Sequence, residues 1–320
     1  MVRSANTPAA INSTALPGGL ALFLGAMIIT LSPIMVRFAD VGPVTSAFWR
    51  LAFAIPILLV WSLWTLSTSS RRLGEMVPDR GGMSSLAFAG LFFALDLAFV
   101  HFAIGYTTVG KVIFLNSLAP IMAILLMWVL FGQRPGRLVL IAAIVALLGS
   151  GLMALSGSTA PGDGAAAANA IALPAGIDPT VWGDGAAFLS GVFYAGYLVI
   201  IGRSQGRLRT PDVMLWSSVF AAIVLLPLAL VEAGPFFPVS TLGWALMIGL
   251  GVFIHAGGQG LIAIGLARGI GKTTLVLLAQ PVMTVLAGWV FLSEGMGMLE
   301  IAGAALILLA VGAVQMKRSA

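Results

Sequence analysis

Long apolar runs separated by short polar joints dominate the pattern of residues along the chain. A helix needs about 20 mainly apolar residues to cross a bilayer. Ten runs meet this criterion, at residues 20–38, 43–66, 83–104, 109–131, 137–155, 181–201, 212–231, 241–264, 271–292 and 297–316. Strand-like alternation of apolar and polar residues is absent, so the pattern predicts an all-α membrane protein with ten transmembrane helices.

The joints between the runs carry turn-forming residues, as in GQRPGR at 132–137. One joint, 156–180, is long, rich in Gly, Ala and Pro, and without periodicity, which predicts a flexible linker. The expected parts are an N-terminal cytoplasmic tail at 1–19, a first five-helix repeat at 20–155, an extracytoplasmic linker at 156–180, a second five-helix repeat at 181–316 and a C-terminal tail at 317–320. The first run has no small-residue cleavage pattern and is interpreted as a retained helix.

The two halves repeat one sequence pattern. Residues 110–151 and 271–312 align without gaps and are identical at 13 of 42 positions, including Lys111/Lys272, Pro120/Pro281 and Trp128/Trp289. Chance similarity between apolar helices is the alternative, but shared Lys, Pro and Trp in one register argue against it. Because each half has five spans, an odd number, the copies must insert with opposite topology. Such inverted repeats predict a central cavity with a binding site near the membrane midplane.

Composition and charge agree with a membrane protein. The chain is 60% hydrophobic and only 8% charged, whereas a soluble domain carries about 25% charged residues. With the N-terminus in the cytoplasm, 13 of the 16 Lys and Arg residues fall in cytoplasmic loops and tails. The positive-inside rule therefore predicts a multi-pass protein of the cell inner (plasma) membrane with both termini cytoplasmic. The basic residues form no patch with interleaved aromatics, so nucleic acid is not an expected partner.

The sequence offers no recognisable enzyme or metal site. It has no cysteine and only two histidines, His101 and His255, which excludes thiolate metal sites and cysteine nucleophiles. No hydrolase, NTPase or zinc motif appears. We therefore expect a protein that is not an enzyme and needs no cofactor. An intramembrane enzyme that uses Asp96 and His255 as an acid–base pair remains an alternative, although no nucleophile is visible.

Asp96 stands near the middle of the third run, within FFALDLAFVH at 92–101. A charged Asp at a helix centre costs about 2.5–3.5 kcal/mol on insertion scales, so its side chain is expected to face protein or water. Candidate partners are Arg50, His101 and His255. The functional hypothesis places Asp96 in the cavity, and the alternative makes it an interhelical hydrogen-bond contact without solvent access.

Further polar residues inside the runs are candidates for binding a substrate. Arginine suits carboxylate capture because its fork binds bidentately, although Arg50 could instead pair with Asp40. Asp–His chains suit proton relays, which leaves proton coupling open; a packing histidine is the alternative for His255. The expected substrate-binding residues are Asp96, His255, Arg50, Asn116, Gln259 and Gln280. Pro120 and Pro281 are expected hinges, because proline permits a bend in a span.

Three stretches carry a resemblance to a known family. They are TSAFWRLAFAIPILL at 45–59, HFAIGYTTVGKVIFLNSLAPIMAILLMWVLFGQRP at 101–135 and LIAIGLARGIGKTTLVLLAQPVMTVLAGWVFLSEGMG at 261–297. The chain resembles the ten-helix EamA-type exporters of the drug/metabolite transporter superfamily. In that family the fourth and ninth helices end near a glutamate; Glu294 fits this pattern, while Gln133 replaces the acid in the first half. The resemblance implies a central cavity lined by helices 1–4 and 6–9.

Repeat and resemblance together predict an inner-membrane transporter that exports small metabolites by alternating access. Amino acids, aromatic or hydrophobic ones among them, are the foremost expected substrates. The alternatives are export of drugs, nucleosides or sugar phosphates, and a passive channel. A channel would need a continuous file of polar residues along the pore, whereas the polar residues here gather at mid-depth.

Overall fold

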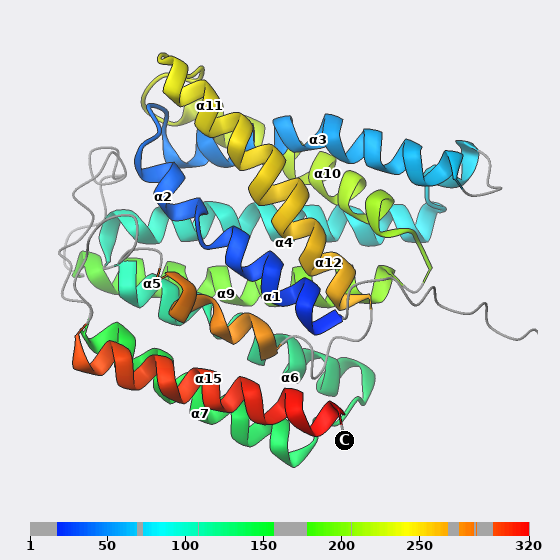
Figure 1. Cartoon of the computed structure of the whole chain (residues 1–320). Coiled ribbons are helices and arrows are strands. Elements are labelled where there is room, and N and C mark those ends of the chain that lie inside the picture. Colours follow the sequence, from blue (N-terminus) through cyan, green and yellow to red (C-terminus); the bar gives the residue numbers. More distant parts are fainter. Residues whose placement is uncertain are drawn as a thin grey trace, which may run out of the picture.

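The computed structural model of the 320-residue chain describes residues 18–68, 73–107, 109–156, 178–205, 207–267, 275–284, 286 and 297–319. Every regular element in these ranges is a helix (Figure 1). Eight of the described helices are long and apolar enough to cross a membrane, and two shorter apolar helices lie at Leu275–Thr284 and Met298–Val314. The predicted all-α fold is confirmed. The ninth predicted span, 271–292, and the linker at 156–180 lie partly outside the described residues.

The described helices follow the predicted runs in chain order. In the first half they are α1 Gly18–Ile29, α2 Ser32–Arg37, α3 Pro43–Ser67, η1 Leu73–Met76, α4 Arg80–Tyr106, α5 Val109–Asn116, α6 Ala119–Phe131 and α7 Arg137–Ser156. In the second half they are α9 Pro179–Ser204, α10 Thr210–Val231, α11 Thr241–Gly249, η2 Leu250–Gln259, α12 Gly260–Leu266, η3 Leu275–Ala279 and α15 Met298–Ser319.

Helix starts carry the residues that satisfy free backbone N–H groups. Asp79 caps α4 by accepting a hydrogen bond from the Gly82 N–H at 2.9 Å. Ser240 caps α11 by accepting one from the Gly243 N–H, also at 2.9 Å. α3 begins with Pro43, whose missing N–H would have no helical partner in the first turn. These local signals fix where each span begins.

Two predicted spans are interrupted. The fourth run, 109–131, is divided into α5 and α6 by a turn at Ser117 and Leu118, which lies directly before Ala119 and Pro120. Proline has no N–H to donate and disfavours helical backbone at the residue before it, so the break stands where the sequence placed a bend. The first run, 20–38, is likewise divided into α1 and α2. Movement at Pro120 stays a prediction.

The eighth span contains a rare helix type. α11, η2 and α12 run as one continuous span, Thr241–Leu266, drawn from yellow to orange in Figure 1. Its middle segment, η2, is a π-helix. π-helical segments are uncommon and occur frequently at functional sites. Here the segment carries His255 and Gln259, both buried.

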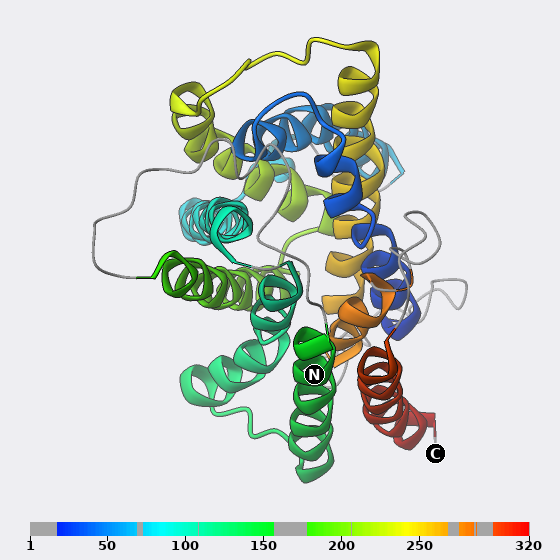
Figure 2. The ribbon, with the colours of Figure 1, turned by 90° about the vertical axis from the view of Figure 1, so that its left-hand side faces the viewer.

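Helix pairing has the symmetry expected of inverted repeats. Counting spans in order, α3 and α10 are the second of each half and pack together, as do α7 and α15, the fifth of each half (Figures 1 and 2). The third span, α4, packs on the sixth, α9. The first span, α1, packs correspondingly on the eighth, η2 with α12. Exchanging the halves therefore converts the α4–α9 contact into the α1–η2 contact.

The back of the molecule is closed by a tight helix crossing. A Cβ added at Gly149 of α7 would lie 2.6 Å from the Gly303 carbonyl oxygen of α15. Only a residue without a side chain permits this approach. It joins the halves along α7 and α15, away from the buried cluster that unites α1, α3, α4, α9, α10 and α12.

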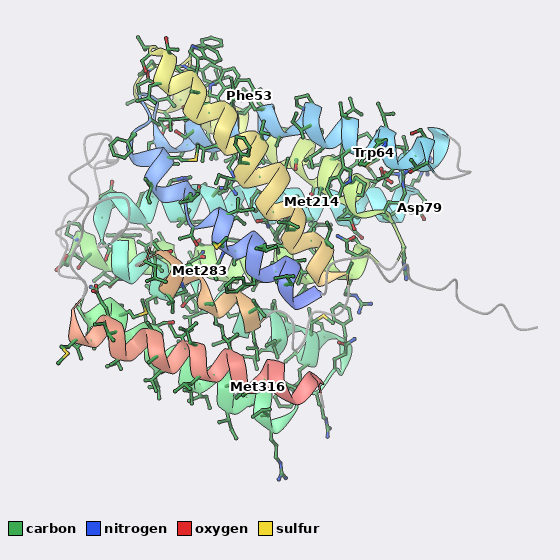
Figure 3. All side chains as sticks on the ribbon, viewed as in Figure 1. Phe53, Trp64, Asp79, Met214, Met283 and Met316 are labelled. Atoms are coloured by element: carbon green, nitrogen blue, oxygen red, sulfur yellow. The ribbon has the colours of Figure 1, made fainter. Side chains whose placement is uncertain are left out.

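The outer surface is apolar. Large side chains such as Val60, Val129 and Leu155 are 65%, 77% and 79% exposed. Figure 3 shows carbon-rich side chains projecting from the outer helices, Trp64 and Met316 among them. Exposed apolar surface of this extent is typical of a protein that sits in a lipid bilayer.

Candidate functional site

Asp96 lies on α4 and accepts two hydrogen bonds through one oxygen, Oδ1. The Ser190 hydroxyl of α9 donates at 2.6 Å, and Asn116 Nδ2, on the last residue of α5, donates at 3.3 Å. Asn116 Nδ2 also donates to Ser190 Oγ at 2.8 Å. Of the three partners considered from the sequence, Arg50 interacts with Asp96 electrostatically. Among the described residues, neither His101 nor His255 hydrogen-bonds Asp96.

Arg50 of α3 is buried with most of its donors unused. Its Nη1 donates to Ser32 Oγ at a long 3.4 Å, and its Nε is buried without a partner. Its guanidinium carbon lies 6.0 Å from the centre of the Phe93 ring. A guanidinium with free donors in such surroundings is suited to binding a carboxylate.

The alternative pairing of Arg50 with Asp40 does not form. Asp40 lies between α2 and α3, where it accepts hydrogen bonds from the backbone N–H groups of Val239 at 3.1 Å and Ser240 at 2.6 Å. Burial alone would raise the pKa of Asp40, but these hydrogen bonds outweigh it and lower the pKa below 3.8. Asp40 therefore holds the loop before α11.

His255 and Gln259 face the same region from the π-helix η2. The Ser218 hydroxyl of α10 lies 2.8 Å from His255 Nε2, and His255 Nδ1 is buried without a partner. The His255 ring centre lies 5.4 Å from that of Phe93. Gln259 is buried near the hydroxyls of Tyr194 and Tyr197 on α9. The π-helix thus presents an imidazole and an amide toward α4, α9 and α10.

These side chains form one mid-chain group, which we call the central cluster. Its rings are in contact, since Phe93 stacks on Tyr197 with centres 4.6 Å apart. Tyr197 in turn lies 6.0 Å from Tyr194. The members are Arg50, Phe93, Asp96, Asn116, Ser190, Tyr194, Tyr197, Ser218, His255 and Gln259.

Five of the six predicted binding residues meet in this cluster, and α9 adds three that the sequence interpretation missed. Ser190, Tyr194 and Tyr197 stand at i, i+4 and i+7 and so share one helix face. That spacing is visible in the sequence and was the available signal. Ser218 carried no such signal, because serines bonded within apolar helices look alike.

The sixth predicted residue, Gln280, is half-buried after η3. Among the described residues its side chain makes no hydrogen bond to the central cluster, while its carbonyl accepts one from the Thr284 hydroxyl at 3.0 Å. Pro281 follows directly, at the change from η3 to α-helix. Glu294, which fits the family pattern, lies outside the described residues.

A cavity of about 1070 Å³ lies beside the central cluster. It is lined by the first turns of α3 and α9 and the last turns of α4 and α10, and its walls are mainly apolar and aromatic, Phe99 and Phe102 included. Asp96, Arg50 and His255 do not line it. The central cluster and this cavity are therefore neighbouring but distinct features.

Hydrogen bonds join α3 and α10 where α10 ends, which we call the Glu232 end. The Glu232 carboxylate accepts from the backbone N–H groups of Val44 at 3.0 Å and Thr45 at 2.7 Å. The Thr45 hydroxyl donates to the Ala229 carbonyl at 3.3 Å. A carboxylate at a helix N-terminus also interacts favourably with the helix dipole. The first turn of α3 is thereby held by the last residues of α10.

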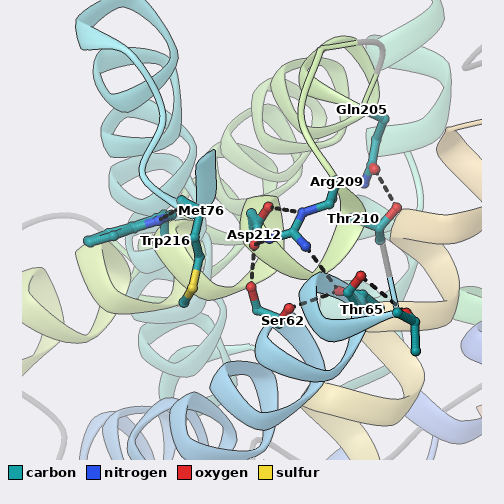
Figure 4. Close-up of polar contacts among 9 residues, drawn as sticks. Ser62, Thr65, Met76, Gln205, Arg209, Thr210, Asp212 and Trp216 are labelled. Atoms are coloured by element: carbon teal, nitrogen blue, oxygen red, sulfur yellow. Dashed lines mark hydrogen bonds and ion pairs between the residues drawn. The ribbon is translucent and has the colours of Figure 1, made fainter. Parts of the chain in front are cut away.

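The opposite end of the same pair, which we call the Asp212 end, is joined by a second network (Figure 4). Arg209 donates through Nε at 2.6 Å and Nη2 at 2.8 Å to the Asp212 carboxylate. The Ser62 hydroxyl of α3 donates to Asp212, and Arg209 Nη1 lies 3.5 Å from the Thr65 hydroxyl. α3 and α10 are therefore fastened at both ends.

The chain is similar to a family of membrane transporters and, in its fold, to a solved structure. The model of the EamA-like transporter family matches residues 16–155 and again 181–315. A solved structure described only as "Crystal structure of protein" has a TM-score of 0.73 at 18% sequence identity, covering 93% of this chain and 97% of that chain. At that identity the likeness establishes the fold alone. A comparison with curated protein sequences gave no match.

Proposed function

The chain belongs to the EamA-like transporter family, and from this premise we propose that it exports amino acids across the cell inner membrane by alternating access. Membership makes it a membrane transporter of small molecules and supports the expectation that it is not an enzyme. The choice of substrate rests on the central cluster, and the mechanism rests on the inverted repeats.

One observation carries the choice of amino acids. Asp96 and Arg50 are an acidic and a basic side chain buried in the same cluster, and each keeps unused hydrogen-bonding groups. An intramembrane charge is costly and is kept where it faces a partner or a substrate. A zwitterion would satisfy both, with its ammonium on Asp96 and its carboxylate on the Arg50 fork.

The rings of the central cluster support apolar and aromatic side chains as the third part of the substrate. Ring contacts join His255, Phe93, Tyr197 and Tyr194 in series, and the Arg50 guanidinium lies 6.0 Å from the Phe93 ring centre. Aromatic pairs gain about 0.5–1.5 kcal/mol beyond the burial of their area. An aromatic amino acid would therefore gain more here than alanine or glycine.

Alternating access explains why the site is buried between equivalent spans. In inverted-repeat transporters one half rocks against the other around a fixed site. The break before Pro120 supplies a place for α5 and α6 to change their angle. With both termini cytoplasmic, the Asp212 end faces the cytoplasm and the Glu232 end faces outward.

A multidrug exporter is the second candidate, and the apolar cavity favours it. A pocket of about 1070 Å³ with aromatic walls could hold a drug-sized apolar compound. Asp96 and Arg50 do not line it, although His101 and Glu232 do, so a compound bound there would need no group that pairs with Asp96 or Arg50. This difference separates the two candidates experimentally.

Counterflow into liposomes tests the proposal. Purified protein is reconstituted with an unlabelled amino acid inside, and uptake of the same labelled amino acid is followed without a pH gradient. The expected result is saturable exchange, strongest for aromatic and hydrophobic amino acids, with the label recovered chemically unchanged. Repeating it with an imposed pH gradient tests proton coupling. Failure to exchange any amino acid, together with dye transport, would overturn the assignment in favour of drugs.

A further inference from the structure

We propose that Ser190 is a positioning residue that holds one oxygen of the Asp96 carboxylate so that the other oxygen receives an ammonium group of the substrate. The inference rests on the proposed amino-acid function and names the chemical group that this part of the site recognises. Ser190 itself is fully buried and acts through Asp96.

The two oxygens of Asp96 have different surroundings. Oδ1 accepts both hydrogen bonds, from Ser190 and from Asn116. Oδ2 accepts none from the described residues, and the Asp96 residue as a whole is 6% exposed. A carboxylate oxygen accepts two hydrogen bonds readily. Oδ1 is therefore saturated, and Oδ2 is the oxygen available to a ligand.

The Ser190 hydroxyl accepts a hydrogen bond from Asn116, which leaves its own hydrogen to be donated to Asp96. Asn116 Nδ2, which has only hydrogens to offer, donates into Ser190 Oγ at 2.8 Å. The hydroxyl must then act as a donor elsewhere, and Asp96 Oδ1 lies 2.6 Å away. Donor chains of this kind strengthen one another in a low-dielectric interior. The chain runs from Asn116 through Ser190 to Asp96 and fixes the carboxylate plane.

Gly191 brings the three helices close enough for this chain. A Cβ at Gly191 would lie 3.0 Å from the Leu115 carbonyl oxygen and 3.6 Å from Asn116 Cα. α9 therefore touches the backbone of α5 at the residue beside Ser190. Any larger residue at position 191 would push α5 away and lengthen the bond from Asn116 to Ser190.

Asn116 is also the last residue of α5, directly before the break at Ser117 and Leu118. A change of angle at this break would move Asn116 relative to Ser190 on the unbroken helix α9. The hydrogen bonds that hold Asp96 are thereby linked to the angle between α5 and α6 in the fourth span. Binding of an ammonium group at Oδ2 and bending of that span would influence one another, as linkage requires.

Selective competition distinguishes positioning from mere packing. Counterflow of labelled phenylalanine is measured with two competitors: phenylalanine methyl ester, which keeps the ammonium, and N-acetylphenylalanine, which keeps the carboxylate. The variants are Ser190→Ala, which removes the donor, and Ser190→Thr, which retains it. Ser150→Ala is the matched control, because Ser150 is a buried serine of α7 whose hydroxyl has no partner.

In Ser190→Ala the inhibition constant of the ester is expected to rise about tenfold, the effect of losing one hydrogen bond to a charged group. Inhibition by N-acetylphenylalanine should stay within about twofold of wild type, because Arg50 is untouched, and Ser190→Thr should restore the ester. Equal losses for both competitors, or no loss for either, would overturn the proposal.

A second measurement covers the case in which the wild type exchanges no amino acid, which would refute the proposed function alone. Phenethylamine, which carries an ammonium and no carboxylate, is added to the purified protein and the shift in Tm is recorded. Positioning by Ser190 requires a shift in wild type and in Ser150→Ala that disappears in Ser190→Ala. An equal shift in all three proteins, or none in wild type, overturns the inference.

Discussion

Trp49 and Trp216 occupy equivalent positions in the two repeats, and each hydrogen-bonds the loop that follows the other's helix. The Trp49 indole N–H donates to the Phe236 carbonyl at 2.7 Å, just beyond α10. The Trp216 indole N–H donates at 3.0 Å to the carbonyl of Met76, the last residue of η1, which follows α3. Aligning the two tryptophans pairs FWRLAFAIPILL at 48–59 with LWSSVFAAIVLL at 215–226. The pairing is a local sign of the two-fold relation between the halves.

The same register relates the two fastened ends of α3 and α10. It pairs Thr45 with Asp212 at the helix starts and Thr65 with Glu232 at the helix ends. At each end of the α3–α10 pair, then, the start of one helix is held by the end of the other. The acid stands at the start of α10 in one contact (Asp212) and after the end of α10 in the other (Glu232), but both contacts join a helix start to a helix end.

We predict that α3 and α10 stay joined at both ends throughout transport. The chain has no cysteine, so Thr45→Cys with Ala229→Cys can be bridged at the Glu232 end by a short, reducible dithiol reagent. Ser62→Cys with Asp212→Cys is the corresponding pair at the Asp212 end. Each bridged protein should exchange at no less than about half the rate of its own reduced form. Arrest that reductant reverses, at either end, would mean that this end opens as a gate.

We expect Trp49→Phe and Trp216→Phe to lower stability separately and additively. Each removes one hydrogen bond to a loop carbonyl, worth about 1 kcal/mol, and the two sites share no partner. Thermal unfolding in detergent should show a lower midpoint for each variant and a larger decrease for the double variant. Trp64→Phe is the control, because Trp64 of α3 is 66% exposed. A decrease for Trp64→Phe equal to the others would assign the effect to ring size.

Arg50 is predicted to recognise the carboxylate of the substrate. Arg50→Gln removes charge and fork together and should raise the KM for an exchanged amino acid by about 100-fold, in line with the loss of a charged hydrogen-bonded pair. Arg50→Lys keeps the charge without the fork and should lie in between.

A comparison of ligands makes this prediction specific. Stabilisation of Tm by phenethylamine, which has no carboxylate, should survive Arg50→Gln. Arg203→Gln is the control, since Arg203 lies over the Phe131 ring at 3.7 Å, outside the central cluster. Loss of phenethylamine binding in Arg50→Gln would show that the arginine supports the fold of the cluster instead.

Asp40 is predicted to contribute to acid lability. Burial opposes its ionisation, but hydrogen bonds from Ser240 and Val239 prevail and lower its pKa in the folded protein. A depressed pKa stabilises the fold above the ordinary aspartate value of 3.8, and this stability is lost as pH falls through the folded value. Asp40→Asn should therefore flatten the decline of Tm between about pH 5 and pH 3. An unchanged slope would mean that other carboxylates govern acid unfolding.

Sequence patterns predicted the parts of this molecule that depend on local chemistry. The run lengths gave the spans, Pro120 marked the break after α5, and the cost of burying Asp96 indicated that it faces other groups. The features that the sequence could not predict depend on how the helices pack against one another. Asn116 of α5 reaches Ser190 of α9 because Gly191 allows the two helices to touch, and no one-dimensional pattern encodes that approach.

The π-helix was equally invisible, because it differs from an α-helix by a single hydrogen-bond register. Its residues, LGVFIHAGGQ, lie within one continuous apolar span, and no motif in them marks the change of register. Gln280 was predicted from its place beside Pro281 in the ninth span; among the described residues its backbone carbonyl accepts a hydrogen bond from Thr284, and its role in binding stays a prediction. Equivalence in sequence fixes the position along a span and leaves the direction of a side chain open.

The π-helix η2 has no counterpart in α4, its partner under exchange of the halves. The central cluster accordingly holds an acid on α4 with a serine on α9, and an imidazole and an amide on η2. A substrate with two chemically different ends would therefore bind in one orientation, with its ammonium toward Asp96 of α4, whichever side of the membrane the site faces. The orientation of a bound substrate would then follow from this difference between η2 and α4.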